Sequence, residues 1–236
     1  MIPKTIHYCW FGRGEKPKLV KKCIESWKKH LPDYALVEWN ENNFDVSQND
    51  FVRQAYAHRN FAFVSDYARA KALYEHGGIY FDTDVEVLQS FDAFLHHMFF
   101  VGFEEKNFVG TCVMGAQKGC ALLRAYMAHY EETAYERPDG TLYADTNVVL
   151  LTQMFEQMGF SRENTFQEKD GIAVYPREWF SPYDYINSVS YITDDSHAIH
   201  HFAQLWLPRS VRMRSALKRK VAKWVDIEKL RKGAKR

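Results

Sequence analysis

Long hydrophobic runs are absent from this sequence of 236 residues. It has no stretch of about 18 apolar residues, so we expect no transmembrane helix. Residues 1–7 lack the apolar centre of a signal peptide and instead predict the start of a strand. Cysteine is scarce, with four residues and no CxxC pair, which favours reduced thiols in a cytosolic protein. There is no internal repeat and no low-complexity segment. Together these absences predict a globular cytoplasmic protein.

Aromatic residues, by contrast, are abundant, and positive charge is concentrated at one end. Hydrophobic residues make up 46% and aromatic residues 16% of the chain, enough for a sizeable core. The formal net charge is +1, yet residues 209–236 hold 12 Lys or Arg against two Asp or Glu. Apolar residues interleave with these basic ones at Val211, Leu217, Val221, Trp224, Val225 and Leu230. We therefore predict a basic amphipathic tail at 209–236 that lies on the anionic inner face of the cytoplasmic membrane. A solvated helix or a nucleic-acid contact is the alternative, and we expect no nucleic-acid partner.

Residues 1–208 form the predicted body, in which strands alternate with helices. The spacing of apolar residues predicts helices at 18–30, 51–58, 65–76, 121–130 and 146–158, and strands at 5–10, 34–39, 79–81, 85–88, 98–103, 108–115, 172–175 and 196–202. This alternation argues for an α/β fold around a parallel sheet. Ser65 is expected to cap the helix at 65–76, with Asp66 in its first turn, and Gly77-Gly78 to end it in a left-handed cap.

Two carboxylates, Asp82 and Asp84, follow the short apolar strand at 79–81. Buried carboxylates without a cation are costly, and oxygen ligands favour Mg²⁺ or Mn²⁺, often with a phosphate-bearing substrate. The alternatives are a solvated turn and a calcium loop. The EF-hand pattern fails because Val87 and Ala93 occupy its glycine and last ligand positions. Asp82-Thr83-Asp84 therefore predicts a metal site for a nucleoside diphosphate.

Further candidates flank this motif. Asp66 and Arg69 share one helix face, either as a local salt bridge or as groups that hold sugar hydroxyls and phosphate. Trp10 ends the first strand and is either core or a platform for a base. His200 and His201 point to opposite faces of a strand, so at most one completes a metal shell.

Other polar segments give weaker signals. The segment 145–147, Asp-Thr-Asn, is typical of a helix N-terminus and is also a candidate to line the reacting face. Glu104-Glu105 follows an apolar strand and could supply a base or support a metal.

Several of these segments, taken in order, resemble glycosyltransferase family 32. They are residues 2–7 with Trp10, 63–69, 77–84, and 200–203 with Trp206. This family comprises DXD-containing sugar transferases of capsular and O-antigen gene clusters; yeast initiating mannosyltransferases are relatives, and glucosylating clostridial toxins are more distant ones. The resemblance covers about residues 2–208. It implies a GT-A fold with a nucleotide-sugar half at about 1–110 and an acceptor half at about 111–208.

The resemblance also implies roles for particular residues. Asp82 and Asp84 would hold Mn²⁺ or Mg²⁺, with His201 as a further ligand. Donor contacts would come from Trp10, stacked on the base, and from Asp66, Arg69, Tyr80, Asp82, Thr83 and Trp206. Leu205 departs from the small polar residue expected before that tryptophan.

The expected function is a metal-dependent retaining glycosyltransferase. It would move a hexose or N-acetylhexosamine from a nucleotide sugar, a UDP-sugar in preference to a GDP-sugar, to a glycan or lipid-linked oligosaccharide in surface polysaccharide synthesis. No protein nucleophile is evident, which favours attack from the leaving-group face, lined by Asp145 or Asn147. The alternatives are a metal-dependent nucleotidyltransferase or phosphohydrolase, a non-catalytic carbohydrate-binding protein, and a toxin-like transferase that acts on a protein.

Overall fold

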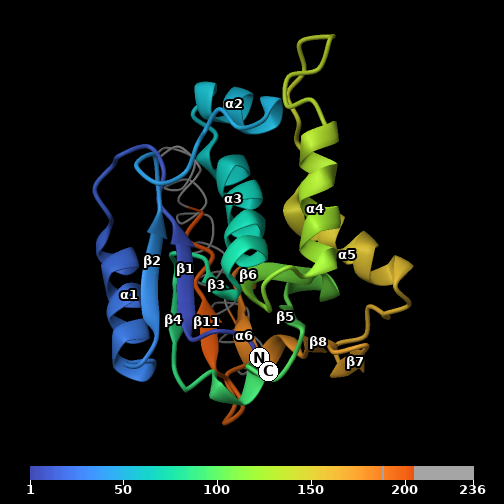
Figure 1. Cartoon of the computed structure of the whole chain (residues 1–236). Helices are drawn as coiled ribbons and strands as arrows, with labels where there is room; N and C mark the ends of the chain where they lie inside the picture. Colours follow the sequence, from blue (N-terminus) through green and yellow to red (C-terminus); the bar gives the residue numbers. More distant parts are fainter. Residues whose placement is uncertain (188, 205–236) are drawn as a thin grey trace, which may run out of the picture.

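A seven-stranded mixed sheet forms the centre of the computed structural model, which describes residues 1–187 and 189–204 (Figure 1). Its strand order is β2-β1-β3-β6-β5-β8-β7. The strands are β1 (Thr5–Cys9), β2 (Ala35–Trp39), β3 (Gly78–Phe81), β5 (Phe99–Phe103), β6 (Val109–Ala116), β7 (Gln167–Lys169) and β8 (Ile172–Tyr175). Two small ribbons join β4 (Val85–Val87) to β11 (Ala198–His200) and β9 (Tyr183–Asp184) to β10 (Val189–Ser190).

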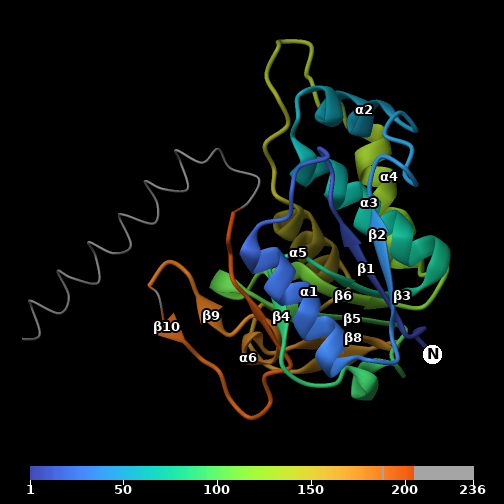
Figure 2. The same cartoon turned by 90° about the vertical axis from the view of Figure 1, so that its left-hand side faces the viewer.

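Helices cover both faces of this sheet (Figures 1 and 2). On one face lie α2 (Asp50–Ala57), α3 (Phe61–His76), α4 (Ala121–Glu132) and α5 (Asn147–Gln157). On the other lie α1 (Lys18–His30), α6 (Arg177–Phe180) and the β4–β11 ribbon. Successive side chains of β3 divide between the two cores, since Tyr80 packs on the α3 side while Ile79 and Phe81 pack on the α1 side. The predicted α/β layering is confirmed.

Helix α1 follows directly from the sequence pattern. Its buried residues Val20, Cys23 and Trp27 recur at helical spacing, and the helix spans the predicted range. The indole N–H of Trp27 donates to the carbonyl of Val85 at 2.8 Å, which fixes α1 to the strand that follows the carboxylate motif.

The expectation of a parallel sheet is only partly met. Strand β1 is parallel to β2 and β3, and β5 is parallel to β8, but β6 runs antiparallel to both β3 and β5. The reason is local, because β5 and β6 are joined by a single 3-10 turn at Glu105–Asn107, too short for a parallel crossover. Strand β6, at the proposed boundary near residue 110, thus lies between two strands from the first half of the chain.

The predicted start of α3 is wrong. The helix begins at Phe61, and Asn60 is its N-cap residue. Ser65 lies one turn inside, where its hydroxyl donates to the carbonyl of Phe61 at 2.9 Å, a back-bond available to serine within a helix. Asp66 and Arg69 therefore sit in the middle of the helix, and the helix N-terminus contributes nothing to them.

Two glycines and a neutral histidine hold the end of α3 against β1. Gly77 has φ 67° and ψ 176°, so its φ is positive as expected but it is not in the left-handed helical cap. A Cβ on Gly78 would lie 2.6 Å from the carbonyl oxygen of Thr5, so only glycine fits there. His7 Nε2 donates to the Gly77 carbonyl at 2.8 Å, and its Nδ1 accepts from the Trp39 indole at 3.1 Å. Burial lowers the pKa of His7 to about 4 and keeps it neutral.

Some predictions fall outside the described residues, namely those on Leu205, Trp206 and the tail at 209–236. Within the described part of the chain, no helix is long and apolar enough to cross a bilayer.

Candidate metal and donor site

The carboxylate motif forms the turn between β3 and β4. The backbone N–H of Asp82 donates to the Cys112 carbonyl on β6 at 2.8 Å, and the N–H of Val85 closes the turn on the Asp82 carbonyl at 2.9 Å. Parallel strands β1 and β3 both end at this edge of the sheet, where α/β proteins commonly bind ligands. The sequence therefore placed the motif correctly.

A buried network joins the motif to the middle of α3. Arg69, 4% exposed, contacts Asp66 Oδ1 at 3.0 Å and Asp82 Oδ1 at 3.1 Å, and donates to the Thr111 carbonyl at 2.9 Å. Its guanidinium also lies 4.6 Å from the ring centre of Tyr80. Burial opposes the charge on Arg69, but Asp82, Tyr80 and Asp66 raise its pKa well above the usual value. Most N–H donors of Arg69 are engaged by these groups. Arg69 therefore positions the carboxylates and has few free N–H groups with which to bind a phosphate.

Asp66 and Asn147 meet across the site. The Asn147 amide, on the first residue of α5, donates to Asp66 Oδ1 at 2.6 Å. Burial raises the pKa of Asp66 to about 6, and Arg69 and Asn147 limit that rise. Asp66 is thus an ionised acceptor near neutral pH. Asp145 is not brought into this network: its side chain is 70% exposed and lies 4.0 Å from Arg137.

Asp84 lies beside His200 on the β11 strand. His200 Nε2 is 3.4 Å from Asp84 Oδ1, and the N–H of Ala203 donates to Asp84 Oδ2 at 2.7 Å. Burial alone would raise the pKa of Asp84, but His200 and this N–H outweigh it and lower the pKa to about 2. One ligand atom from each of Asp82, Asp84 and His200 lies within 4.8 Å of the others. Two carboxylates with one imidazole suit Mn²⁺, and Mg²⁺ less well.

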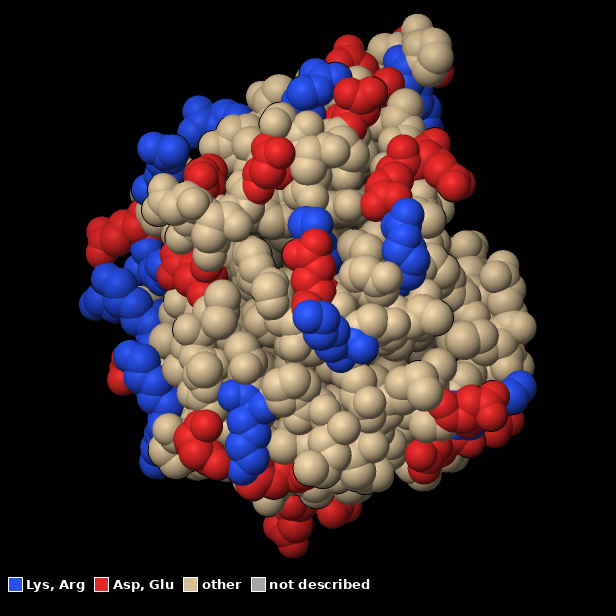
Figure 3. Space-filling view, in the orientation of Figure 1, with Lys and Arg blue, Asp and Glu red and all other residues tan. Residues whose placement is uncertain are grey.

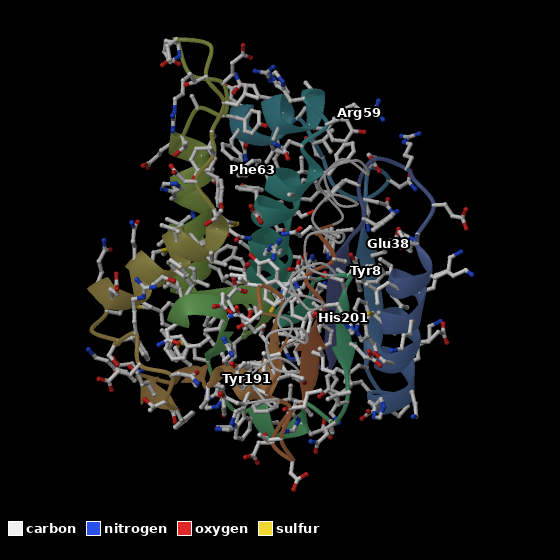
Figure 4. The ribbon with its side chains drawn as sticks, turned by 180° about the vertical axis from the view of Figure 1, so that it is seen from behind. Tyr8, Glu38, Arg59, Phe63, Tyr191 and His201 are labelled. Atoms are coloured by element: carbon white, nitrogen blue, oxygen red, sulfur yellow. The ribbon has the colours of Figure 1, made fainter. Side chains whose placement is uncertain are left out.

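His201 is a correction to the ligand prediction, since the structure does not place it with the two aspartates. The β4–β11 register sets His200 opposite Val85 and turns the next side chain to the other face. There His201 Nε2 lies 2.9 Å from Glu86, which also pairs with Lys22 of α1 at 2.8 Å. Figure 4 shows His201 on the side of the molecule that carries α1.

The remaining candidate donor-binding residues, Tyr80, Thr83 and Trp10, lie near the ends of β3 and β1. The Tyr80 hydroxyl donates to Asp82 Oδ1 at 3.0 Å, and half-buried Thr83 lies within the turn. Continuing the β1–β3 register by three residues puts Trp10 level with Thr83. The Trp10 indole N–H donates to the Gly14 carbonyl at 2.7 Å, and the Lys16 ammonium lies 5.7 Å from the ring centre.

A pocket of about 290 Å³ opens beside Trp10. Its lining is mostly polar and consists of Trp10, Arg13, Gly14, Lys16, Glu38, Asn40, Glu41 and Asn42. Of these, the sequence singled out Trp10 alone. Residues 40–42 come from the turn-rich segment after β2, and only strand pairing brings that segment to the first strand.

Glu104 is the acidic residue whose importance the sequence understated. Burial raises its pKa to about 7, with smaller opposing effects from His200 and Arg69. Its carboxylate lies within 4.8 Å of ligand atoms on Cys112 and His200. The sequence signal, a carboxylate after an apolar strand, was present but did not show which groups it would face.

Comparisons with known proteins match the part of the chain that contains the Asp82-Thr83-Asp84 motif. Residues 17–100 match the family described as the glycosyltransferase sugar-binding region containing a DXD motif. Over 164 residues, 64% of the chain, the sequence is 32% identical to inositol phosphoceramide mannosyltransferase 3 of Schizosaccharomyces pombe. The chain spans 44% of the length of that relative.

Solved structures give the fold. The PaToxG glycosyltransferase superposes with a TM-score of 0.50 at 19% identity, covering 66% of this chain and 69% of that one. The galactosyltransferase LgtC, in complex with donor and acceptor sugar analogues, gives a TM-score of 0.44 at 14% identity, covering 90% and 94%. The α/β fold with its mixed central sheet is thus of the GT-A glycosyltransferase type.

Proposed function

We propose that the protein is a metal-dependent retaining glycosyltransferase, because residues 17–100 match the glycosyltransferase sugar-binding region containing a DXD motif. Its donor is a nucleoside diphosphate sugar, a hexose or N-acetylhexosamine carried by UDP in preference to GDP. Its acceptor is a glycan or a lipid-linked oligosaccharide of a surface polysaccharide. The observation that carries this proposal is the group of Asp82, Asp84 and His200 at the sheet edge beside the pocket at Trp10.

The metal is held by Asp82, Asp84 and His200, with His200 replacing the residue favoured by the sequence. The donor set and the burial of Asp84 support this assignment, because a buried carboxylate is costly without a cation. A bound Mn²⁺ or Mg²⁺ supplies electrostatic stabilisation of the leaving diphosphate.

Asp66 binds the donor sugar or ribose. Its ionised carboxylate accepts a hydroxyl hydrogen bond, and Arg69 and Asn147 fix its orientation from two sides. Arg69 also lies 3.1 Å from Asp82 Oδ1. These contacts prepare the site before the donor arrives, so little reorganisation is needed during the reaction.

The base occupies the pocket at Trp10. The indole face offers a stacking surface, and the N–H that bonds to Gly14 holds the ring in place. Lys16 and Arg13 line the pocket together with Glu38 and Glu41, and Lys16 pairs with Glu38 at 2.8 Å.

Retention follows from attack of the acceptor hydroxyl on the leaving-group face, with a phosphate oxygen taking the proton. Asn147, which donates to Asp66 in the buried Arg69 network, lines the leaving-group face of the donor sugar. Asp145, exposed on the loop before α5, is left for contact with the acceptor. A product with inverted anomeric configuration contradicts this part of the proposal.

A donor screen tests the function. UDP- and GDP-sugars are incubated with the full chain, Mn²⁺ and oligosaccharide acceptors, and the released nucleotide is identified. A glycosyltransferase releases the nucleoside diphosphate. Release of a nucleoside monophosphate or a sugar phosphate indicates a nucleotidyltransferase or phosphohydrolase. Binding without turnover indicates a carbohydrate-binding protein.

We further propose that the protein is peripheral on the inner face of the cytoplasmic membrane. The charge of residues 209–236 supports this, as does an exposed apolar hairpin next to the last described residues (Figure 2). In that hairpin Ile186 is 49%, Val189 41% and Ile192 51% exposed. Its Tyr185 stacks on Phe202 at 4.6 Å between ring centres, which joins the hairpin to the segment that leads into the tail. Basic side chains also gather over α1 (Figure 3).

A further inference from the structure

We propose that Glu104, Cys112 and His200 form a binding site for a thiophilic divalent ion of the Zn²⁺ type. The site adjoins the DXD carboxylates and shares His200 with them. A carboxylate oxygen, a thiol sulfur and an imidazole nitrogen, one from each residue, lie within 4.8 Å of one another. This inference concerns ion binding and does not depend on the proposed sugar transfer.

The fold brings these three side chains together from strands β6 and β11 and from the residue after β5. Glu104 follows β5, and its backbone N–H donates to the Phe108 carbonyl at 2.8 Å, which closes the turn into β6. Cys112 lies on β6 next to the DXD turn, since its carbonyl accepts from Asp82. His200 ends β11. At Gly110 a Cβ would lie 3.1 Å from Glu104 Oε2, so the missing side chain leaves room for the carboxylate.

Two groups of this cluster lack a hydrogen-bond partner in the described part of the chain. His200 Nδ1 is buried and has no hydrogen-bond partner within residues 1–187 and 189–204. In that same part of the chain, the carboxylate of Glu104 makes no hydrogen bond or ion pair. Buried polar groups usually find a partner, and a buried group without one can mark the place of a bound ion. A single cation between these atoms engages the Glu104 carboxylate, the His200 imidazole and the neighbouring thiol of Cys112 together.

The ligand chemistry separates this site from the aspartate site. A thiolate favours Zn²⁺ and similar ions, whereas carboxylate oxygens suit Mg²⁺ and Mn²⁺. Zinc takes Cys, His and carboxylate ligands at about 2.0–2.3 Å, commonly with three protein ligands and an open fourth position. Binding breaks the S–H bond of Cys112, forms the metal–sulfur bond and releases one proton to solvent.

Sharing His200 couples the two sites. An ion held by Cys112 and Glu104 draws on the imidazole that the aspartates also use, and two divalent charges this close repel each other. Zn²⁺ therefore competes with Mn²⁺ for His200, and Cys112 biases that competition towards thiophilic ions.

Co²⁺ titration of the metal-free full-length chain tests the proposal, because Co²⁺ bound to a thiolate gives a charge-transfer absorption band. We expect the band in the wild type at one equivalent. It should be lost in Cys112→Ser and kept in Cys120→Ser, whose buried thiol lies at the N-terminus of α4, away from the cluster. Zn²⁺ should bleach the band, and excess Mn²⁺ should shift the Co²⁺ titration to higher concentration.

Glu104→Gln provides a second variant in case Cys112→Ser does not fold. We expect it to keep the wild-type circular dichroism spectrum and to weaken Co²⁺ and Zn²⁺ binding by about 10-fold or more. The proposal is overturned by absence of the band in the wild type, by a band that survives Cys112→Ser, or by unchanged affinity in a folded Glu104→Gln variant.

Discussion

Replacing Arg69 by methionine tests how strongly burial governs the charge network at the site. Arg69 and Asp66 are three residues apart on α3 and are 5% and 7% exposed at the side chain. Removing the guanidinium leaves the buried carboxylate of Asp66 and the partly exposed one of Asp82 without their cation. Breaking a buried pair from one side typically costs about 3–5 kcal/mol. Because domain stability is about 5–15 kcal/mol, this is a large share of the whole.

The chain offers a matched control on α2. Arg53 and Asp50 have the same residue types and the same spacing, at 2.7 Å, but their side chains are 53% and 82% exposed. Water screens that pair, so Arg53→Met should cost no more than about 1 kcal/mol. The assay is urea unfolding at pH 7, followed by tryptophan fluorescence, on the wild type and both single variants.

A second substitution identifies the cause of the loss. In the double variant Asp66→Asn/Arg69→Met, one uncompensated carboxylate is gone, so we expect it to be more stable than Arg69→Met alone. Unfolding free energies for Arg69→Met and Arg53→Met that agree within about 1 kcal/mol would refute the reasoning. So would a double variant less stable than the single one.

The remaining predictions concern the metal, the tail and pH. Asp84→Asn should remove the rise in melting temperature caused by Mn²⁺ and lower the rate of nucleotide release about 100-fold or more, whereas the control Asp50→Asn should keep the wild-type rise and rate. Full activity in Asp84→Asn counts against the metal assignment. Truncation after Pro208 should reduce binding to anionic liposomes and spare activity on soluble acceptors, and unchanged liposome binding excludes the membrane proposal. The pKa of His7 is about 4 in the folded chain, below its unfolded value near 6.5, so its contribution to stability is present at pH 7 and is lost as the pH falls. Between pH 7 and 5 the wild type should lose about 2 kcal/mol more than His7→Gln, and parallel pH profiles contradict this.

Local signals in the sequence were sufficient for several elements. The spacing of Val20, Cys23 and Trp27 predicted α1 with its observed bounds. Gly77-Gly78 before a short apolar segment predicted the chain reversal and the strand that ends at the carboxylates. Such features depend on neighbours in the chain, so a single sequence reveals them.

The start of α3 shows where a local signal misleads. Ser65 is a favoured capping residue, but serine inside a helix can bond back to the preceding turn, as it does here to Phe61. Asn60, the N-cap residue, donates instead to the hydroxyl of Tyr135, a contact with a residue 75 positions away. Sequence spacing alone could not separate these outcomes.

By itself, the sequence determined the class of this protein: an α/β chain whose aspartate motif follows a buried strand, with Asp66 and Arg69 on one helix face. Only the tertiary structure decided which partners those groups meet. Because side chains alternate along a strand, the sequence predicted that His200 and His201 point to opposite faces. The pairing of β11 with β4 decided that His200 is the one facing Asp84. Likewise, the antiparallel insertion of β6 brought Cys112 to the motif. Burial and long-range strand pairing set these contacts, and neither is encoded in the spacing of nearby residues.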